Sequence, residues 1–546
     1  MTTLVILRFL GIFAVYTGVT LALPALMFRR ILRGRSLAEQ FLMCYTFGNF
    51  YIINIVFLLQ LLHISNFFTL AGLTAVLSIV IGGRVNRIPL KQQAGNTWHL
   101  FSKLLRGRMK LKSAIFLFLG KCAEGIKRLA KFFYRHIVKN PIQSMLLLGI
   151  GVCLCWIYGR QIILVYGYRA SDIPVHMSWI NEMSRGKIFA KGVYPFGFHC
   201  MIYYLHAVFR FDTYVILCQF FFAQVIFMHL VLLAMLKQLC KTKYIPYIGT
   251  FVFLLGNFWS GQTYSRFYAT LPQEFGMIFV IPSIYFLIRF FQIPKQKLAD
   301  KETRLTLQCF AMAFSLTLAI HFYGTMIAGL CCIGIACGFC FRFLRKEYFR
   351  RIMFTGICSV FLAVLPMGIA FATGTPLQGS LGWGLSVING GKSSSSTETE
   401  AETDEAETLE VSTGDDKNTV RVVKPDGTVM EIDVSDLPSA QENESGGQTQ
   451  TETTAPAVPK VSFGEKIRKI PGKAKNALSE MSSRILEFII KLDVKNIGYM
   501  ILASFALLLL IGFIFCVFRQ TEYGAMLMSM GFCMWIVTIL LCANVF

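Results

Sequence analysis

The strongest constraint on this fold is a series of apolar runs, each near bilayer length, that recurs along most of the chain. A helix needs about 20 largely apolar residues to cross the hydrocarbon core. Hydrophobic residues make up 55% of the sequence and charged residues only 15%, whereas soluble domains carry roughly 25% charged residues. The sequence therefore predicts an all-α polytopic membrane protein with about 12 transmembrane helices.

These runs divide the chain into five parts. The predicted spans are Leu4–Phe28, Phe41–Leu62, Phe67–Gly83, Ile142–Tyr158, Tyr214–Leu236, Ile245–Trp259, Phe275–Phe291, Leu305–Ile320, Thr325–Phe341, Ile352–Phe371, Ile497–Phe518 and Tyr523–Val545. The predicted parts are three N-terminal transmembrane helices (1–83), a basic amphipathic segment (84–141), a seven-span module (142–371), an external loop (372–495) and two C-terminal transmembrane helices (496–546).

Charge is distributed unevenly along the chain, and this asymmetry predicts its orientation. The net charge is +23, and basic loops normally face the cytoplasm. If Arg29–Arg35 is cytoplasmic, alternating spans place every later basic loop on the same side. The segment Tyr166–Arg210, the loop Gly261–Glu274 and His321 then fall on the opposite, outer side. We expect a multi-pass protein of the plasma membrane with this orientation.

The basic segment 84–141 carries a short apolar patch, Ala114–Gly120, flanked by lysines. The patch is too short to span a bilayer, so an amphipathic helix at the cytoplasmic interface is expected. Its predicted partners are anionic membrane lipids. Nucleic acid is not a predicted partner, because cytoplasmic loops are basic by default.

The outer loop 372–495 contains a strongly acidic insert, 390–460, rich in Ser, Thr and Glu. Low hydrophobicity with high charge predicts disorder. Within it, Arg421–Val434 alternates apolar residues around Pro-Asp-Gly, a hairpin signal. An amphipathic helix over 462–492 is expected to follow, lying on the outer membrane surface.

The first outer loop, 161–211, is too polar to cross a bilayer and too patterned for a slack connector. The spacing of Asp172, His176, Trp179 and Met183 places them on one face if the segment is helical. A second short helix is expected after Tyr194-Pro195, lying in the interface rather than crossing.

Asp172 and His176 are the first candidate site residues. A carboxylate near a reacting hydroxyl acts as a general base, and a nearby imidazole shares the proton or contacts a phosphate. Alternatively, Asp172 is the N-cap of a helix that has Pro174 in its first turn. The two side chains also suit a metal, although two ligands do not define a site.

The remaining candidates come from later outer segments. Arg266 offers a planar fork that fits phosphate oxygens, while an interfacial Tyr/Arg belt is the alternative. Glu274, at a span boundary, is either a helix N-terminal charge or a site group. His321 ends a span, where an ionisable group suggests function, although it is equally consistent with a structural role, as is His199.

This layout resembles the seven-span module of the type C glycosyltransferase (GT-C) superfamily. Asp172 in SDIPVHMSWINEMSRG matches the acid of that family's first outer loop, and YPFGFH (Tyr194–His199) is similar to the run that opens its second juxtamembrane helix. His321 in AIHFYG and the LPQE run ending at Glu274 are similar to later outer positions. The resemblance implies a lipid-linked sugar donor, with Asp172 as base or metal contact. Because many members carry two acids here, a divalent metal is implied only if Glu182 or Glu274 supplies the second acid.

The sequence thus predicts a membrane glycosyltransferase that moves a sugar from a polyprenyl-phosphate donor to an acceptor on the outer face, in cell-envelope glycan assembly. Asp172 would be the base, and His176, His199, Arg266, Glu274 and His321 would bind substrate or phosphate. Other classes fit the same features: a transporter or flippase, a polymerase of lipid-linked polysaccharide, or a non-catalytic membrane protein. No phosphate-binding glycine loop or Walker motif supports soluble nucleotide chemistry.

Overall fold

The structure is a computed structural model that describes residues 2–87, 137–165, 167–259 and 266–379 continuously. It also describes the backbone of three short strands between 410 and 433, and isolated positions within 95–135 and 504–531. The chain forms two compact units, one of Met1–Leu385 with Leu492–Phe546, the other of Ser386–Lys491. Each unit is considered by itself.

The first unit is built from helices. In chain order they are α1 (Thr2–Thr17), the π-helix η1 (Gly18–Ala22), α2 (Leu23–Met27), α3 (Arg29–Leu32), α4 (Leu37–Leu61), α5 (Phe67–Asn86), α8 (Pro141–Leu154), the π-helix η2 (Cys155–Gly159), α9 (Gln161–Leu164), α10 (Ile173–Ser184), α11 (Gly197–Phe209), α12 (Thr213–Leu239), α13 (Ile245–Trp259), α15 (Pro272–Gln292), η3 (Lys295–Lys297), α16 (Lys301–Ile320), α17 (Phe322–Gly338), α18 (Cys340–Phe343) and α19 (Lys346–Ala372).

Among the described residues, eight helical segments are long and apolar enough to cross a membrane, so the protein is membrane-embedded. They are Thr2–Met27, Leu37–Leu61, Phe67–Asn86, Pro141–Leu164, Thr213–Leu239, Pro272–Gln292, Lys301–Ile320 and Lys346–Ala372. All eight match predicted spans. Two further predicted spans correspond to the shorter apolar helices α13 and α17, and the last two lie largely outside the described residues.

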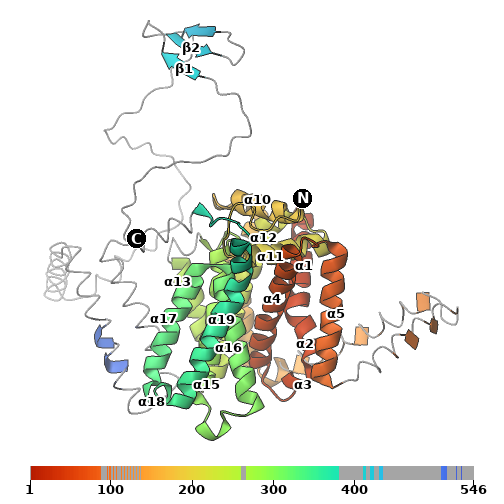
Figure 1. Cartoon of the computed structure of the whole chain (residues 1–546). Helices are drawn as coiled ribbons and strands as arrows, with labels where there is room; N and C mark the ends of the chain where they lie inside the picture. Colours follow the sequence, from red (N-terminus) through yellow and green to blue (C-terminus); the bar gives the residue numbers. More distant parts are fainter. Residues whose placement is uncertain are drawn as a thin grey trace, which may run out of the picture. The chain divides into compact units, whose positions relative to one another are not determined.

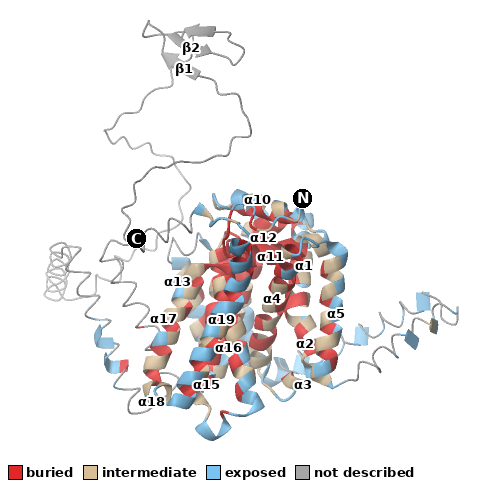
Figure 2. Ribbon diagram, in the orientation of Figure 1, coloured by how far each residue is buried: buried red, intermediate tan, exposed pale blue. Residues whose placement is uncertain are grey.

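The N-terminal helices belong to the same packed bundle as the rest of the first unit. Helix α4 contacts α11, α12 and α16, and it is among the most buried elements. Helices α5 and α19, in contrast, bury only a narrow stripe, and Figure 2 shows their outer faces exposed. The stretch predicted as a seven-span module therefore packs around a helix that precedes it in sequence.

One end of the bundle collects the basic loops. Arg35, after α3, forms an ion pair with Glu302 at 2.5 Å, and Ser36 accepts a hydrogen bond from Gln238 at the end of α12. Lys295 pairs with Glu347 at 2.6 Å. These contacts join four basic loops that are far apart in sequence, as the positive-inside analysis requires.

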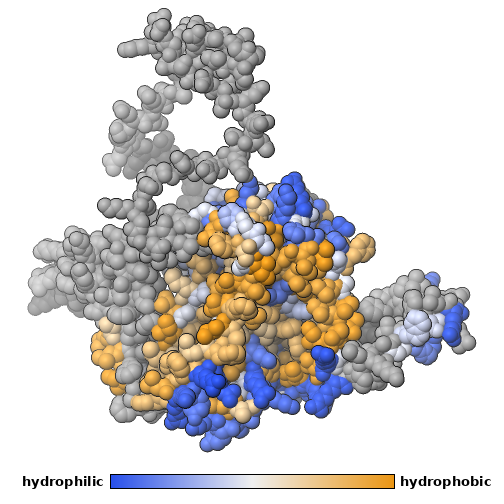
Figure 3. Space-filling view, in the orientation of Figure 1, coloured by the Kyte–Doolittle hydropathy of each residue, from blue (hydrophilic) through white to orange (hydrophobic). Residues whose placement is uncertain are grey.

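The opposite end carries the N-terminus and α10 (Figure 1). Between the two polar ends, the side chains of the first unit form an apolar band (Figure 3). Many large apolar side chains of the first unit are exposed, including Leu26, Phe68 and Phe354. Exposed apolar side chains arranged as a belt are what contact with lipid requires.

Helix α11 differs from its expected place at the membrane interface. Its first nine residues, Gly197–Leu205, are all buried, and it packs against α4, α5, α10 and α12. An interfacial helix keeps one face in contact with water or headgroups, and α11 has no such face over these residues. Its sequence, GFHCMIYYL, is apolar or aromatic on every side, which is typical of a helix buried within a bundle.

The second unit contains a three-stranded antiparallel sheet of β1 (Glu410–Thr413), β2 (Thr419–Val423) and β3 (Val429–Asp433), in that order. Strands β2 and β3 pair with Val423 opposite Val429, and the Pro-Asp-Gly sequence lies between them in the chain. The other predictions for 390–460, for the helix over 462–492 and for most of the basic segment 84–141 fall outside the described residues.

The closest helix contact predicts the effect of one substitution. A Cβ on Gly48 of α4 would lie 2.4 Å from the carbonyl oxygen of Thr20 in η1. Gly48→Ala should therefore force the two helices apart, at a cost of about 1–3 kcal/mol or more. Gly356→Ala in α19 is the matched control, because a Cβ there meets nothing within 4 Å. Thermal denaturation of the detergent-solubilised protein should show a lower melting temperature for Gly48→Ala only. Equal melting temperatures would contradict this packing.

Candidate functional site

Helix α10 lies across the end of the bundle away from the basic loops. It buries His176, Trp179 and Met183, so the helical face predicted from their spacing is confirmed. The Gln60 amide of α4 donates to the carbonyl oxygen of Met183 at 2.9 Å. This bond ties the C-terminal turn of α10 to one of the most buried helices of the first unit.

Asp172 occupies the N-cap position of α10, but its side chain makes no capping hydrogen bond. Its Oδ1 instead accepts a hydrogen bond from the Ser171 hydroxyl at 3.2 Å. Asp212, which starts α12, shows the usual behaviour, because its Oδ1 accepts from the Val215 backbone N–H at 3.2 Å. The Asp172 carboxylate is thus exposed and not engaged in capping the helix that it begins.

His176 and His199 form a buried pair between α10 and α11. The Nδ1 of His176 lies 3.0 Å from the Nε2 of His199, and the ring of Trp179 packs against both. Burial lowers the pKa of His176 to about 4, although the Asp172 carboxylate opposes the shift. Burial, with nearby His176 and His321, holds the pKa of His199 well below its usual value. Both rings are therefore neutral at pH 7.

Arg266 and Glu274 form the charged pair of the site. The Arg266 Nε donates to Glu274 Oε1 at 2.6 Å, and Nη2 donates to Gln273 Oε1 at 2.9 Å. Glu274 is buried, whereas about half of the Arg266 side chain is exposed. A guanidinium has five N–H donors, so Arg266 is held in place and keeps donors for a ligand.

His321 connects α16 to α17 in an extended conformation, and its Nδ1 accepts from the Tyr323 backbone N–H at 3.3 Å. Burial, together with the neighbouring His176 and Arg266, lowers its pKa to about 4. Its ring packs edge-on against Tyr194, with 6.1 Å between the ring centroids.

Two glycines bring the helix ends of the site together. A Cβ on Gly197 of α11 would lie 2.8 Å from the Ala319 carbonyl oxygen of α16. A Cβ on Gly276 of α15 would lie 3.3 Å from Ile320. Because these backbones approach so closely, the imidazoles of His199 and His321 come to the same place as Glu274.

The segment that follows α19, residues 373–379, reaches the site, and we call it the strap. After α19, the chain pairs in parallel with the loop between α10 and α11. The Val193 N–H donates to the Pro376 carbonyl at 2.8 Å, and the Gln378 N–H donates to the Val193 carbonyl at 3.2 Å. Gly192 has a φ of +104°, and a Cβ there would lie 2.7 Å from Gln378. This pairing places Gln378 at the site.

These elements enclose a cavity of about 310 Å³. Its lining residues are Asp172, Val175, His176, Trp179, Tyr194, Arg266, Leu271, Pro272, Gln273, His321 and Gln378. Four of the six predicted site residues line it, and the other two hold a lining side chain, since His199 contacts His176 and Glu274 contacts Arg266. The structure thus gathers all six at one place.

His199 and Glu274 were expected to touch substrate, and their positions correct that expectation. His199 is fully buried behind His176, and neither residue lines the cavity. The Nδ1 of His199 and the Oε2 of Glu274 have no hydrogen-bond partner within the described ranges. Both lie behind lining side chains that they contact, His199 behind His176 and Glu274 beside Arg266.

Seven lining residues were absent from the predicted site, and four of these seven are polar or aromatic. Two of them belonged to patterns noted in the sequence: Trp179 to the predicted helical face, and Tyr194 to the YPFGFH run. Gln273 stood in the LPQE run. Gln378, in contrast, follows the last span of the module and carried no signal in sequence, because only the strap brings it back to the first outer loop.

The site does not fit a divalent metal. No group of three or more His, Cys, Asp or Glu side chains suited to a metal occurs among the described residues. In the part of the chain that the structure describes, Asp172 is the one carboxylate that lines the cavity, and the nearby carboxylate of Glu274 is already paired with Arg266. Cations such as Mg²⁺ and Ca²⁺ need several oxygen ligands.

Comparison of the chain with protein-family models, with curated proteins and with solved structures found no match. The function must therefore be argued from the geometry of the site.

The buried histidine pair predicts how stability depends on pH. An unfolded chain protonates His176 near pH 6.5, while the folded chain resists protonation until about pH 4. Its neutral form therefore favours the folded state fully above pH 6.5, and this advantage is lost as pH falls towards 4. The melting temperature of the wild type should fall over this range. His176→Gln should lose less, and the exposed His99→Gln should follow wild type; parallel curves for all three would refute the prediction.

The ion pair between Arg266 and Glu274 predicts that the effects of substituting its two members on the free energy of unfolding are not additive. Arg266→Gln leaves a buried carboxylate without its cation, so it should destabilise more than the double change with Glu274→Gln. A coupling of about 0.5–3 kcal/mol is expected, towards the low end because Arg266 is half exposed. The matched control is Glu182 with Arg185 on α10, paired at 2.6 Å at the surface, which should couple by less. Denaturation of the four-member cycle measures both; equal coupling would contradict a role for burial.

Proposed function

We propose that this protein is a membrane glycosyltransferase that moves a sugar from a polyprenyl-phosphate donor to an acceptor hydroxyl. The proposal rests on one cavity that is lined by a carboxylate and a guanidinium. The carboxylate of Asp172 makes no helix-capping hydrogen bond, and the guanidinium of Arg266 is held by Glu274. Transfer from a sugar phosphate needs a base for the incoming hydroxyl and a positive charge for the departing phosphate.

The proposed reaction assigns one role to each group. Asp172 accepts the proton of the acceptor hydroxyl while that oxygen forms a new bond to the anomeric carbon of the sugar. The bond between this carbon and the phosphate oxygen breaks, and its electron pair stays on the phosphate. Arg266 stabilises the added negative charge with its remaining N–H donors. Polyprenyl phosphate needs no acid catalyst to leave.

The histidines enter this reaction as neutral groups. The sequence suggested that His176 and His321 would help Arg266 supply positive charge to the phosphate. Their pKa values near 4 mean that both rings are uncharged at pH 7. In the proposed site they hydrogen-bond to substrate, and Arg266 supplies the charge.

The aromatic lining suits a sugar. Trp179 and Tyr194 lie beside each other, with ring centroids 5.5 Å apart, on the wall that also holds His176. A sugar ring presents C–H groups on its faces and hydroxyls around its edge. Aromatic faces can pack against the first, while Gln273 and Gln378 can hydrogen-bond to the second.

The topology completes the proposal. We infer about twelve spans in the plasma membrane, with the basic loops in the cytoplasm and the cavity on the outer side. The acidic insert, 390–460, would then be extracytoplasmic. The clustering of basic loops at the end away from the cavity supports this orientation. A lipid-linked donor would enter from the surrounding bilayer.

Asp172→Asn tests the proposed base. A positioned general base contributes about 10²–10⁴-fold to rate, so the variant should lose at least about 100-fold in sugar transfer. Cells that lack the protein would be complemented with each variant, and surface glycan and accumulated lipid-linked sugar would be measured. Asp212→Asn is the matched control, because asparagine also caps helices well.

The expected result is loss of the added sugar from surface glycan, with lipid-linked sugar accumulating, for Asp172→Asn alone and at an unchanged melting temperature. If correctly inserted Asp172→Asn protein supports normal surface glycan, the enzyme assignment fails. A transporter, a polymerase or a non-catalytic role would then have to explain the cavity.

A further inference from the structure

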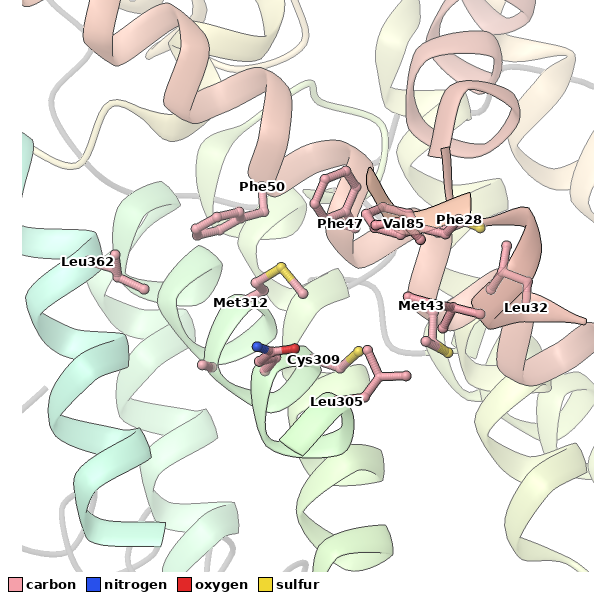
Figure 4. Close-up of a pocket in the computed structure, with 14 residues that line it drawn as sticks. Phe28, Leu32, Met43, Phe47, Phe50, Val85, Leu305, Cys309, Met312 and Leu362 are labelled. Carbon is pink, nitrogen blue, oxygen red and sulfur yellow. The ribbon is translucent and has the colours of Figure 1, made fainter. Parts of the chain in front are cut away.

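A second cavity lies at the basic end of the bundle, away from the candidate site. It measures about 490 Å³ and is enclosed by α3, α4, α16 and α19, with residues from the ends of α2 and α5 (Figure 4). Its lining residues are Phe28, Ile31, Leu32, Met43, Cys44, Phe47, Phe50, Val85, Leu305, Gln308, Cys309, Ala311, Met312 and Leu362. Only Gln308 among them is polar.

This cavity is more than a groove on the lipid-facing surface. Leu32, Met43 and Cys309, from three different helices, line it and are themselves buried. Gln308 and Leu362, in contrast, are exposed, so the cavity reaches from the core to the outside. Figure 4 shows Met312 and Phe50 on one side and Met43 and Phe28 on the other. Its volume is in the range of known ligand pockets, about 300–1,000 Å³.

Five arginines flank the apolar lining in sequence. Arg29, Arg30 and Arg33 flank the lining residues Ile31 and Leu32, while Arg84 and Arg87 flank Val85. All five are exposed, and none forms an ion pair within the described ranges. Arg35, by comparison, is paired with two glutamates. Exposed arginines that form no ion pair within these ranges therefore adjoin the apolar lining in sequence.

Hydrogen bonds between the Asn86 side chain and the backbone near α3 hold the two groups of arginines together. The Arg30 backbone N–H donates to Asn86 Oδ1 at 3.0 Å, and the Asn86 amide donates to the Met27 carbonyl at 3.1 Å. These bonds fix the turn between α2 and α3 against the last turn of α5. As a result, the positive charge of α3 and that of the α5 C-terminus share one rim.

We propose that this cavity binds one phospholipid with an anionic headgroup. An acyl chain would occupy the space between α4 and α16, and the headgroup phosphate would contact the arginines of α3 and α5. Apolar depth beside unpaired guanidiniums fits the two parts of such a lipid. This site is separate from the sugar cavity, and its occupancy does not depend on the proposed reaction.

Titration of the full-length protein with lipid, followed by native mass spectrometry, tests this proposal. Phosphatidylglycerol and phosphatidylcholine with the same acyl chains are the probes. Phosphatidylglycerol should bind at a single site at least tenfold more tightly. Arg29→Gln with Arg30→Gln should weaken its binding roughly 30-fold, since each basic residue contributes about fivefold. Arg345→Gln with Arg350→Gln, two exposed arginines elsewhere at the basic end, should leave binding within twofold of wild type.

A cavity-filling change tests the acyl-chain half. Met312→Trp should abolish tight phosphatidylglycerol binding, whereas Ile357→Trp on the exposed face of α19 should not. Three results would overturn the proposal: equal binding of the two lipids, wild-type binding by the Arg29/Arg30 variant, or unchanged binding by folded Met312→Trp. In each case another occupant, such as an apolar helix of this chain or of a second copy, would have to cover the cavity.

Discussion

The candidate site depends on the close approach of α11 to the ends of α15 and α16. Gly197 allows α11 to approach α16, because a side chain there would meet the Ala319 backbone, and Gly276 allows α15 to approach Ile320 of α16. The contact sets His199 behind His176 and turns His321 towards the same cavity. Helix α11 is buried over Gly197–Leu205 instead of resting on the membrane surface, and it therefore supports α10, which packs against it.

The sequence predicted the first unit well wherever a single physical signal dominated. Apolar length located the eight long spans, and helical spacing located the buried face of α10. Patterns of polar residues at span ends found all six residues that gather at the cavity. Charge asymmetry found the loops that meet around Arg35. These signals are local, or they sum over many residues, so one chain is enough to read them.

Other features could not be predicted because they arise only from packing. The burial of α11 follows from contacts with helices before and after it in the chain. Gln378 reaches the cavity through backbone pairing that any side chain could make. The neutrality of His176 is a consequence of burial, which spacing alone does not give. The structure is therefore needed to see that Arg266, and not His176 or His321, carries the positive charge at the cavity.

The strap has a mechanical consequence. The chain that leaves α19 is fastened to the loop beside Tyr194 by two backbone hydrogen bonds at Val193, and the second unit begins only a few residues later, at Ser386. The short piece of main chain that follows α19 is thus part of the cavity wall. Loss of these two bonds would release Gln378 from the rim of the cavity.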